Sequence, residues 1–343
     1  MQTLKADPPS KIGVLLAQLG TPSAPTAAAL RPYLKQFLSD RRVIDLNPLK
    51  WLPILHLFVL TRRPSRSARL YGRIWRPEGS PLMVHSRAQE SGLQRRLGNS
   101  YRVILGMRYG QPSIAEAMRT LARENIERIL VFPMFPQFSA STTGSIYDAV
   151  VRAALGRRCP LFFDRRRLMP TLRFVPPYYD HPAYIDALKV GIQENIARLE
   201  RSPDCFLITF HGIPQRYVDE GDPYRRHCET TAHLLADALG LKPEEWVTGF
   251  QSRFGREQWL QPYTEDLLLT LGGKGMRALV ATCPGFTADC LETLDEIGNE
   301  GADQFHRGGG RQFHLTPCLN SHPAWLDAMA TIAGRETAGW IDD

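Results

Sequence analysis

The sequence predicts an α/β protein with two similar lobes. Its apolar runs are short and rich in β-branched residues, and longer segments of helical period separate them. This alternation is typical of a parallel sheet with crossover helices. The strand-like runs fall into two sets of three, and the length of 343 residues exceeds the ~100 to 200 residues of a common domain. Two lobes therefore fit both the pattern and the length.

The strands are expected to lie within the apolar runs. In the first half these cover residues 12–19, 102–107 and 128–135, and in the second half they cover residues 206–210, 246–251 and 279–283. Helices are expected between them, for example over residues 114–125, 182–201 and 227–239. The second of these opens with a proline, which an early helical position tolerates. The basic, proline-bearing stretch at residues 156–177 is the predicted hinge between the lobes.

Composition and charge narrow the class of protein. Apolar residues make up 43% and charged residues 22%, as in ordinary globular chains, which excludes wholesale disorder and fibrous repeats. Lys and Arg number 42 against 35 acidic residues, a formal charge of +7, and this excess indicates an anionic partner such as phosphate, carboxylate, nucleic acid or a lipid head group. The six cysteines contain no C-x-x-C pair and the N-terminus lacks an export pattern, so we expect reduced thiols in the cytoplasm.

Residues 46–60 form an unusual segment, LNPLKWLPILHLFVL, with a pair of arginines on either side. A bilayer span needs ~20 apolar residues, so this segment is too short to cross a membrane. It is either a buried helix or an exposed apolar lip, at a pocket mouth or on a membrane surface, with the arginines facing anionic head groups. We favour the lip.

Candidate functional residues lie in loops that follow strands, because ligands of open α/β sheets bind beyond the carboxyl ends of the strands. The loop after the strand at residues 206–210 begins with His211. The loop after the last expected strand leads into a helix on which Glu292, Glu296 and Glu300 recur every four residues, so their carboxylates form a row. The row is either a solvated face or a path for cations or protons. An imidazole facing a carboxylate can hold a divalent transition metal loosely or exchange protons near neutral pH.

Two further loops carry polar groups. A hydroxyl cluster at residues 139–145 either caps a helix or binds an anion, and Arg108 and Tyr109 follow the second expected strand. Gly-rich nucleotide motifs are weak, because residues 271–275 lack the P-loop spacing and no G-x-G-x-x-G follows a strand and opens a helix. We therefore exclude nucleotide binding as the main activity.

At these residues the chain resembles the ferrochelatases, which insert ferrous iron into protoporphyrin IX in the last step of haem synthesis. The matching stretches follow the family's order along nearly the whole chain: LLAQLGTP (15–22), MRYGQP (107–112), FPQFSASTTGS (135–145), FHGIPQRYVDEGDPY (210–224), FQSRFGREQWLQPYT (250–264) and CPGFTADCLETLDEI (283–297). The resemblance implies two Rossmann-like lobes of the chelatase type around a cleft, over residues 1–165 and 166–322. It also implies a C-terminal helix, within residues 323–343, that packs back on the first lobe.

Carried over residue by residue, the resemblance implies that His211 and Glu292 face each other across the porphyrin as the catalytic and metal-contacting groups. It implies a proton or metal path along a helix that widens into π-type turns, which Gly298 would ease. The implied path residues are Glu296, Glu300 and Asp289. The implied porphyrin contacts are Arg63, Tyr71, Ser80, Leu19, Arg108, Trp259 and Phe286, and residues 46–60 match the family's hydrophobic lip.

Three departures limit this transfer. Cys290 stands where some members have a second active-site histidine. Leu19 and Phe135 stand where others have Met or Tyr. The chain ends at Asp343 without the cysteine-bearing tail of the members that hold a [2Fe-2S] cluster. We therefore expect no cluster and no permanently bound cofactor, since ferrous iron is a substrate.

The sequence thus predicts a ferrochelatase of the lyase class. We expect a monomer in the cytoplasm, with peripheral contact at the inner face of the membrane, transient contact with the preceding haem-pathway oxidase and no nucleic-acid partner. In the expected mechanism, closing lobes bend the porphyrin while His211 accepts pyrrole protons and Glu292 helps to receive iron. Two alternatives stay open: a chelatase for another metal or a more carboxylated porphyrin, and a two-lobed carrier of haem or metal without chemistry.

Overall fold

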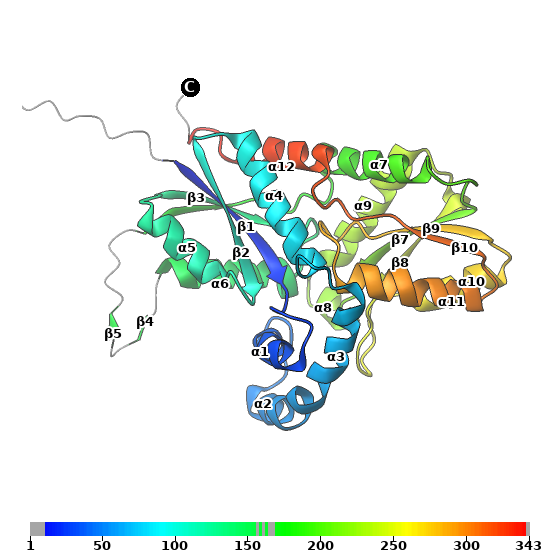
Figure 1. Ribbon diagram of the computed structural model, residues 1–343, viewed down its shortest axis with the longest axis horizontal. Coiled ribbons are helices and arrows are strands. Elements are labelled where there is room, and N and C mark those ends of the chain that lie inside the picture. The colour runs from blue at the N-terminus through cyan, green and yellow to red at the C-terminus, as the bar shows by residue number, and fades with distance from the viewer. Residues whose placement is uncertain (1–10, 156–157, 160–161, 164–168, 341–343) are drawn as a thin grey trace, which may run out of the picture.

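Two parallel sheets of four strands each form the centre of the protein, which confirms the predicted α/β class (Figure 1). The computed structural model describes residues 11–155, 158–159, 162–163 and 169–340. The first sheet has the order β2-β1-β3-β6 and the second has the order β10-β9-β7-β8. The strands of the first sheet are β1 (Ile12–Gly20), β2 (Tyr101–Tyr109), β3 (Arg128–Pro133) and β6 (Thr171–Phe174). Those of the second are β7 (Cys205–His211), β8 (Trp246–Gln251), β9 (Ala278–Thr282) and β10 (Gln312–Leu315).

All six predicted strands are present, and their ends differ from the prediction by at most two residues. The sequence pattern does not predict β6 and β10, which are four-residue edge strands with mostly half-buried residues. A strand of this kind lacks the continuous apolar run that marks a strand buried on both faces. β1 has such a run because it pairs with β2 on one side and β3 on the other.

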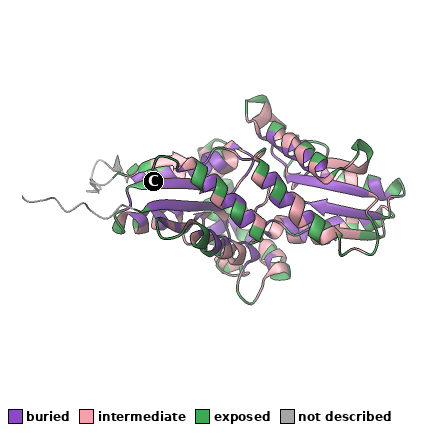
Figure 2. Cartoon of the chain, turned by 90° about the horizontal axis from the view of Figure 1, so that it is seen from above, coloured by how far each residue is buried: buried purple, intermediate pink, exposed green. Residues whose placement is uncertain are grey.

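Helices cover both faces of the sheets, and alternate residues of a strand point to opposite faces. In β1, Val14 and Leu16 belong to a core that also contains Trp325 of α12, whereas Leu15 and Ala17 pack with residues of α5 and α6. Figure 2 shows the resulting pattern, in which the strands are mostly buried and the helices are buried along their inner faces. The helices are α1 (Ala27–Leu38), α2 (Pro48–Ile54), η1 (Leu55–Val59), α3 (Leu60–Ile74), α4 (Pro81–Leu97), α5 (Ile114–Arg123), η2 (Ala140–Gly144), α6 (Ser145–Leu155), α7 (Pro182–Ile196), α8 (Gln215–Asp219), α9 (Tyr224–Leu239), η3 (Pro243–Glu245), α10 (Thr264–Gly273), η4 (Glu292–Gly301), α11 (Ala302–Arg307) and α12 (Pro323–Glu336).

The C-terminal helix α12 joins the two halves of the chain. It packs against α4 and β3 of the first lobe and runs beside α7, as the upper part of Figure 1 shows. The hydroxyls of Tyr101 and Thr337 are 2.8 Å apart at this contact. The predicted hinge at residues 156–177 lies partly outside the described residues, and its described part contains β6, the edge strand of the first sheet. Two short antiparallel strands, β4 (Arg158–Cys159) and β5 (Phe162–Phe163), also fall within it.

Helices α1 to α3 project from the first lobe, at the bottom of Figure 1, and we name residues 27–74 the α1–α3 unit. The predicted lip lies in this unit as α2, η1 and the start of α3. Leu49, Leu57 and Phe58 are 86%, 65% and 59% exposed, so the alternative of a wholly buried helix is wrong and the exposed lip is confirmed. Leu55 and Leu60 are buried and fix the unit's inner side. None of the helices in the described residues has the length and apolarity to span a bilayer.

Candidate active site between the lobes

A cavity of about 520 Å³, open to solvent, lies between the lobes. The carboxyl ends of β1 and β3 form its floor in the first lobe, α1, α3 and the start of α4 form one wall, and the loop from β9 to η4 reaches it from the second lobe. The cavity therefore lies where the carboxyl ends of parallel strands meet, as an α/β sheet requires.

Five of the residues predicted from the sequence line this cavity: Leu19, Tyr71, Ser80, Phe286 and Glu292. Leu19 lies at the end of β1, and Tyr71 lies on α3. Ser80 caps the N-terminus of α4, where its hydroxyl accepts a hydrogen bond from the Met83 amide at 3.2 Å. Most of the remaining wall is apolar, so a flat apolar ligand fits it.

His211 ends β7, and its ring geometry fixes the position of its proton. The Nδ1 atom lies 2.6 Å from the Gly212 carbonyl oxygen. A carbonyl only accepts hydrogen bonds, so Nδ1 carries a hydrogen, and in the neutral ring Nε2 is the acceptor. The indole of Trp259 lies beside the imidazole, with the ring centroids 6.2 Å apart. His211 thus has an available basic nitrogen at a strand end.

The row of carboxylates lies on η4, a ten-residue π-helix from Glu292 to Gly301. The π-type widening implied by the family resemblance is therefore present, and such turns often occur at functional sites. Glu292 and Glu296 are half-buried, whereas Glu300 is exposed at the outer end. The row leads from the cavity to solvent.

Glu296 is the carboxylate whose electrostatics involve His211. Burial raises the pKa of Glu296, and the Glu292 charge adds to this, while the Ser252 hydroxyl and the charge of His211 act in the opposite direction. The Ser252 hydroxyl donates a hydrogen bond to Glu296 Oε2 at 2.6 Å. A raised pKa makes this carboxylate a better proton acceptor near neutral pH than an exposed one.

The end of β8 orients the row from the side. The Gln251 side-chain amide donates to the Glu292 carbonyl oxygen at 3.0 Å, and the next residue, Ser252, has a φ of 66°. This left-handed conformation is rare for a non-glycine residue. It occurs here at the residue whose hydroxyl donates to Glu296. Sequence reasoning missed both residues, although they lie in the matching stretch FQSRFG.

An ion pair joins η4 to the first lobe. Arg73 of α3, whose side chain is 54% exposed, lies 3.4 Å from the buried carboxylate of Asp295 and 3.9 Å from the exposed carboxylate of Glu300. The Asn299 amide also donates to Asp295 at 2.9 Å. Sequence reasoning missed this pair because its partners are 222 positions apart.

Asp289 does not line the cavity. Its buried carboxylate accepts hydrogen bonds from the Thr293 hydroxyl, the Cys318 amide and the Asn320 side chain. These partners tie the start of η4 to the loop before α12. The structure therefore gives Asp289 a fixed structural environment away from the predicted proton path.

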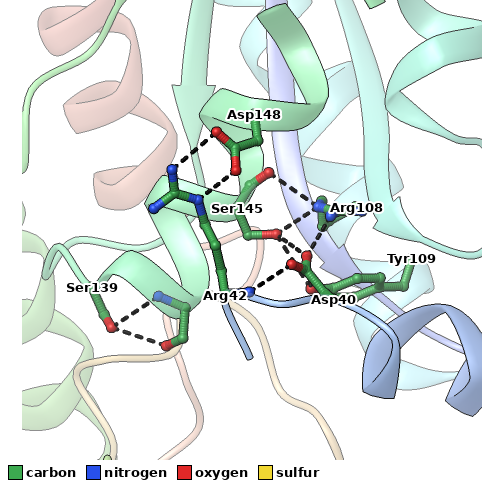
Figure 3. A network of polar contacts seen from close by, with 8 residues as sticks. Asp40, Arg42, Arg108, Tyr109, Ser139, Ser145 and Asp148 are labelled. Carbon is green, nitrogen blue, oxygen red and sulfur yellow. Dashed lines mark hydrogen bonds and ion pairs between the residues drawn. The ribbon is translucent and has the colours of Figure 1, made fainter. Parts of the chain in front are cut away.

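Arg108 also lies outside the cavity lining, and Figure 3 shows its actual partners. Its guanidinium pairs with Asp40 and donates to the Ser145 hydroxyl at 2.6 Å. The hydroxyls of Tyr109 and Ser145 donate to the same Asp40 carboxylate at 2.8 and 2.6 Å. This network fixes the end of α1 to β2 and α6. Within it, the positive charge of Arg108 is paired with the Asp40 carboxylate.

Arg63 lies on the α1–α3 unit with its guanidinium over the ring of Phe254, 5.1 Å from the centroid. Burial and the nearby charge of Arg66 lower the pKa of Arg63. Because Phe254 belongs to the second lobe and is 60% exposed, this contact bridges the two lobes near the surface. Arg63 has no carboxylate partner among the described residues.

Two buried groups in the cavity wall stay protonated. Burial, together with the charge of Glu292, raises the pKa of the Cys290 thiol well above its usual value. A neutral thiol is a weak base and a weak metal ligand, so Cys290 cannot take the part of a histidine base. Tyr33, which sequence reasoning missed, donates its hydroxyl to the Gly20 carbonyl oxygen at 3.2 Å, and burial raises its pKa as well.

In the part of the chain that the structure describes, no group of three or more His, Cys, Asp and Glu side chains is arranged to hold a metal ion. The pair of His211 and the carboxylate row is thus an open arrangement. Its carboxylates begin at the cavity with Glu292, whereas His211 is not among the residues that line the cavity.

Comparison with known proteins identifies the family whose members this chain resembles. The ferrochelatase family model matches residues 11–337. A ferrochelatase from Azoarcus sp. (strain BH72) is 46% identical over 334 residues, covering 97% of this chain and 89% of its relative. A ferrochelatase from Alcanivorax borkumensis is 44% identical and covers 97% and 96%. The solved structure of SirB from Bacillus subtilis with Fe3+ superposes with a TM-score of 0.57 over 96% of each chain, at 12% identity, which is a likeness of fold.

Proposed function

The chain belongs to the ferrochelatase family and is an enzyme of haem synthesis; from this premise we propose that porphyrin metalation takes place in the cavity between its lobes. The proposed substrates are protoporphyrin IX and ferrous iron. Formally a lyase reaction, the insertion releases the two pyrrole protons of the porphyrin as iron takes their place on the ring nitrogens. The protein must therefore bind a flat apolar ring, accept two protons and admit a cation.

His211 is proposed to accept the pyrrole protons, and the observation that carries this proposal is its tautomer. In the neutral ring, the contact between Nδ1 and the Gly212 carbonyl oxygen places the hydrogen on Nδ1 and leaves Nε2 to accept a proton, and neutral imidazole is the best base near neutral pH. A base that is already in the right tautomer needs no rearrangement before it accepts a proton.

The carboxylate row is proposed to receive iron and to carry protons away. Glu292 lines the cavity, and Glu296, whose pKa is raised by burial, is suited to take a proton from His211 and pass it toward Glu300 at the surface. The two lobes supply opposite faces of the site, which favours a bent ring over a flat one if the lobes close on it.

The apolar wall and Arg63 are proposed to bind the two chemically different parts of the porphyrin. Leu19 and Phe286 line the cavity in which the macrocycle would lie. Arg63 lies over Phe254 and has no carboxylate partner within the described part of the chain, so it can pair with a propionate.

Peripheral contact with an anionic membrane is proposed for the lip. Residues 46–77 contain seven Lys and Arg residues and no acidic residue, and the remaining 35 basic residues equal the 35 acidic ones in number. The whole net charge of +7 thus belongs to the segment that also exposes Leu49 and Phe58. Apolar side chains beside cations suit a surface of anionic lipid. There the lip would receive an apolar porphyrin from the oxidase of the preceding step.

The direct test mixes the purified protein with ferrous iron and protoporphyrin IX without oxygen and follows the absorption spectrum as it becomes that of haem. We expect His211→Ala and Glu292→Gln to lower the rate by about 10²-fold or more, while both variants keep the wild-type circular dichroism. Glu229→Gln, which removes one partner of an exposed ion pair on α9, is the control and should keep the full rate. Normal rates in both site variants would contradict the proposal, and competition with a porphyrin of four carboxylate arms tests the choice of macrocycle.

A further inference from the structure

The loop between α1 and α2 is held to both lobes at once. At one end Asp40 is bound into the first lobe by Arg108, Tyr109 and Ser145 (Figure 3). Five positions later, Asp45 is bound to the second lobe. Because the loop is short, the α1–α3 unit cannot move away from either lobe without breaking one of these attachments.

The attachment at Asp45 is a two-point ion pair. Arg216 of α8 donates from Nη1 to Oδ2 of Asp45 at 2.7 Å and from Nη2 to Oδ1 at 3.1 Å. The neighbouring Tyr217 hydroxyl donates to the Val43 carbonyl oxygen at 3.3 Å. A bidentate pair fixes orientation as well as distance. The segment that begins with His211 at the end of β7 thus also holds the base of the lip.

The two attachments differ in strength. The Asp40 side chain is only 9% exposed, whereas Asp45 and Arg216 are 38% and 41% exposed. Water and salt screen an exposed ion pair much more than a buried one. Arg216 also contacts Glu220 at 3.1 Å and Glu257 at 3.0 Å, both on its own lobe. It therefore keeps two carboxylate partners when it releases Asp45, which makes the Asp45 contact the easier one to open.

The other end of the α1–α3 unit stays attached when Asp45 is released. Arg73, near the end of α3, binds the buried Asp295 of η4. The unit contributes Tyr33, Tyr71 and Ile74 to the cavity wall. A rotation of the unit about the Arg73 end would thus widen the cavity on the side of Asp45.

We propose that Asp45 and Arg216 form a releasable clasp that holds the α1–α3 unit against the second lobe over a bound ligand and opens for its entry and exit. They are positioning residues and touch no reacting atom. The effect on porphyrin exchange rests on the proposed function, while the closure of the unit does not.

The test compares two variants that each remove one carboxylate from Arg216. Asp45→Asn breaks the contact between the lobes, and Glu257→Gln, of similar exposure, breaks one within the second lobe. The first readout is hydrogen exchange of the backbone amides of residues 43–60 in the ligand-free protein. The second is the dissociation rate of protoporphyrin IX from its fluorescence, with KM and kcat measured separately.

We expect Asp45→Asn to speed both exchange and dissociation by about three- to fivefold, the range for a favourable exposed pair, and to raise KM more than it lowers kcat. Glu257→Gln should behave as the wild type. Arg216→Gln should match Asp45→Asn in the exchange of residues 43–60, and the double variant should add nothing further, because both changes remove the same contact between the lobes, whereas the pairs of Arg216 with Glu220 and Glu257 lie within the second lobe.

Three results would overturn the clasp: unchanged exchange in Asp45→Asn, equal effects of Asp45→Asn and Glu257→Gln, or full additivity in the double variant. If exchange increases while the protein binds no porphyrin at all, the proposed function fails and the clasp stands. If porphyrin binds and exchange is unchanged, the clasp fails and the function stands.

Discussion

The Asp40 network predicts a large loss of stability from a single truncation. Asp40→Ala removes the carboxylate that accepts hydrogen bonds from Tyr109, Ser145 and the Arg42 amide. It also leaves the guanidinium of Arg108, which is 20% exposed, without its counter-charge. Burial raises the pKa of Asp40, but the hydrogen bonds from Ser145 and the Arg42 amide, together with the charge of Arg108, lower it below its usual value overall. The charged form is thus the one that the fold stabilises.

Breaking a buried pair by removing one partner costs about 3 to 5 kcal/mol. The Arg108 side chain keeps some contact with water, so we expect the lower end, about 3 kcal/mol for Asp40→Ala. With a urea m-value of about 3 kcal/mol per molar, the unfolding midpoint should fall by about 1 M. The contribution of a carboxyl with a lowered pKa is present above the pKa of the unfolded state and is lost as the pH falls below it, so the wild type and the variant should converge as the pH approaches 3.

The assay is urea unfolding at pH 7, followed by circular dichroism and by tryptophan fluorescence. Glu124→Gln is the matched control, because Glu124 pairs with Arg102 at the surface, with 39% and 35% of the two side chains exposed, and an exposed pair contributes less than about 1 kcal/mol. Equal midpoints for Asp40→Ala and Glu124→Gln would refute the reasoning that burial gives the Asp40 network its strength.

Three further predictions concern the backbone, pH and the lip. Gly20→Ala should cost about 3 kcal/mol in thermal unfolding, because Gly20 has a φ of +114° and a Cβ there would lie 1.8 Å from the Tyr109 carbonyl oxygen; Gly72→Ala on α3, with no atom within 4 Å of its new Cβ, should cost nothing. His227 accepts a hydrogen bond from the Phe138 amide across the lobes, and burial, with the charge of Arg226, lowers its pKa to about 4. The neutral ring therefore stabilises the fold above pH 6.5, and that contribution is lost as the pH falls toward 4, so the free energy of unfolding of the wild type should fall by about 1 to 2 kcal/mol at pH 5. In urea unfolding, an equal fall of the unfolding free energy in a His227→Gln variant between pH 7 and pH 5 would contradict this. Leu49→Glu should weaken sedimentation with anionic vesicles about tenfold or more, while Val151→Glu, at an exposed apolar residue on α6, should leave it unchanged.

Local pattern was enough to predict the strands and the lip. β1, β3 and β7 are buried on both faces, so their sequences are continuous apolar runs between loops. The strands β6 and β10 lack this signal because each has only four residues, none of which is fully buried. The predicted helix at residues 182–201 ends earlier, at Ile196, since apolar periodicity gives only weak signals for a helix end.

The candidate site could be predicted only in part, because several of its contacts are made between lobes. His211 and Glu292 follow strands, and that position alone indicates a ligand site. The role of Ser252 depends on the hydrogen bond from its hydroxyl to Glu296, and the role of Arg73 depends on the contact between α3 and η4. Both contacts are visible only in the folded protein. No spacing along the chain predicts such pairs. The same limit explains Arg108, whose cation was expected at a ligand but is neutralised by Asp40 from the end of α1.

The uneven distribution of charge makes the protein an electrical dipole. Since residues 46–77 carry the full excess of seven positive charges and the rest of the chain is formally neutral, the positive end of the dipole lies along α3, next to the lip. A field from any anionic surface turns such a molecule before contact, and steering of this kind raises productive encounters at low salt. Approach would therefore be with the lip and α3 first, and the frequency of correct encounters should fall as ionic strength rises even where the final contacts are apolar.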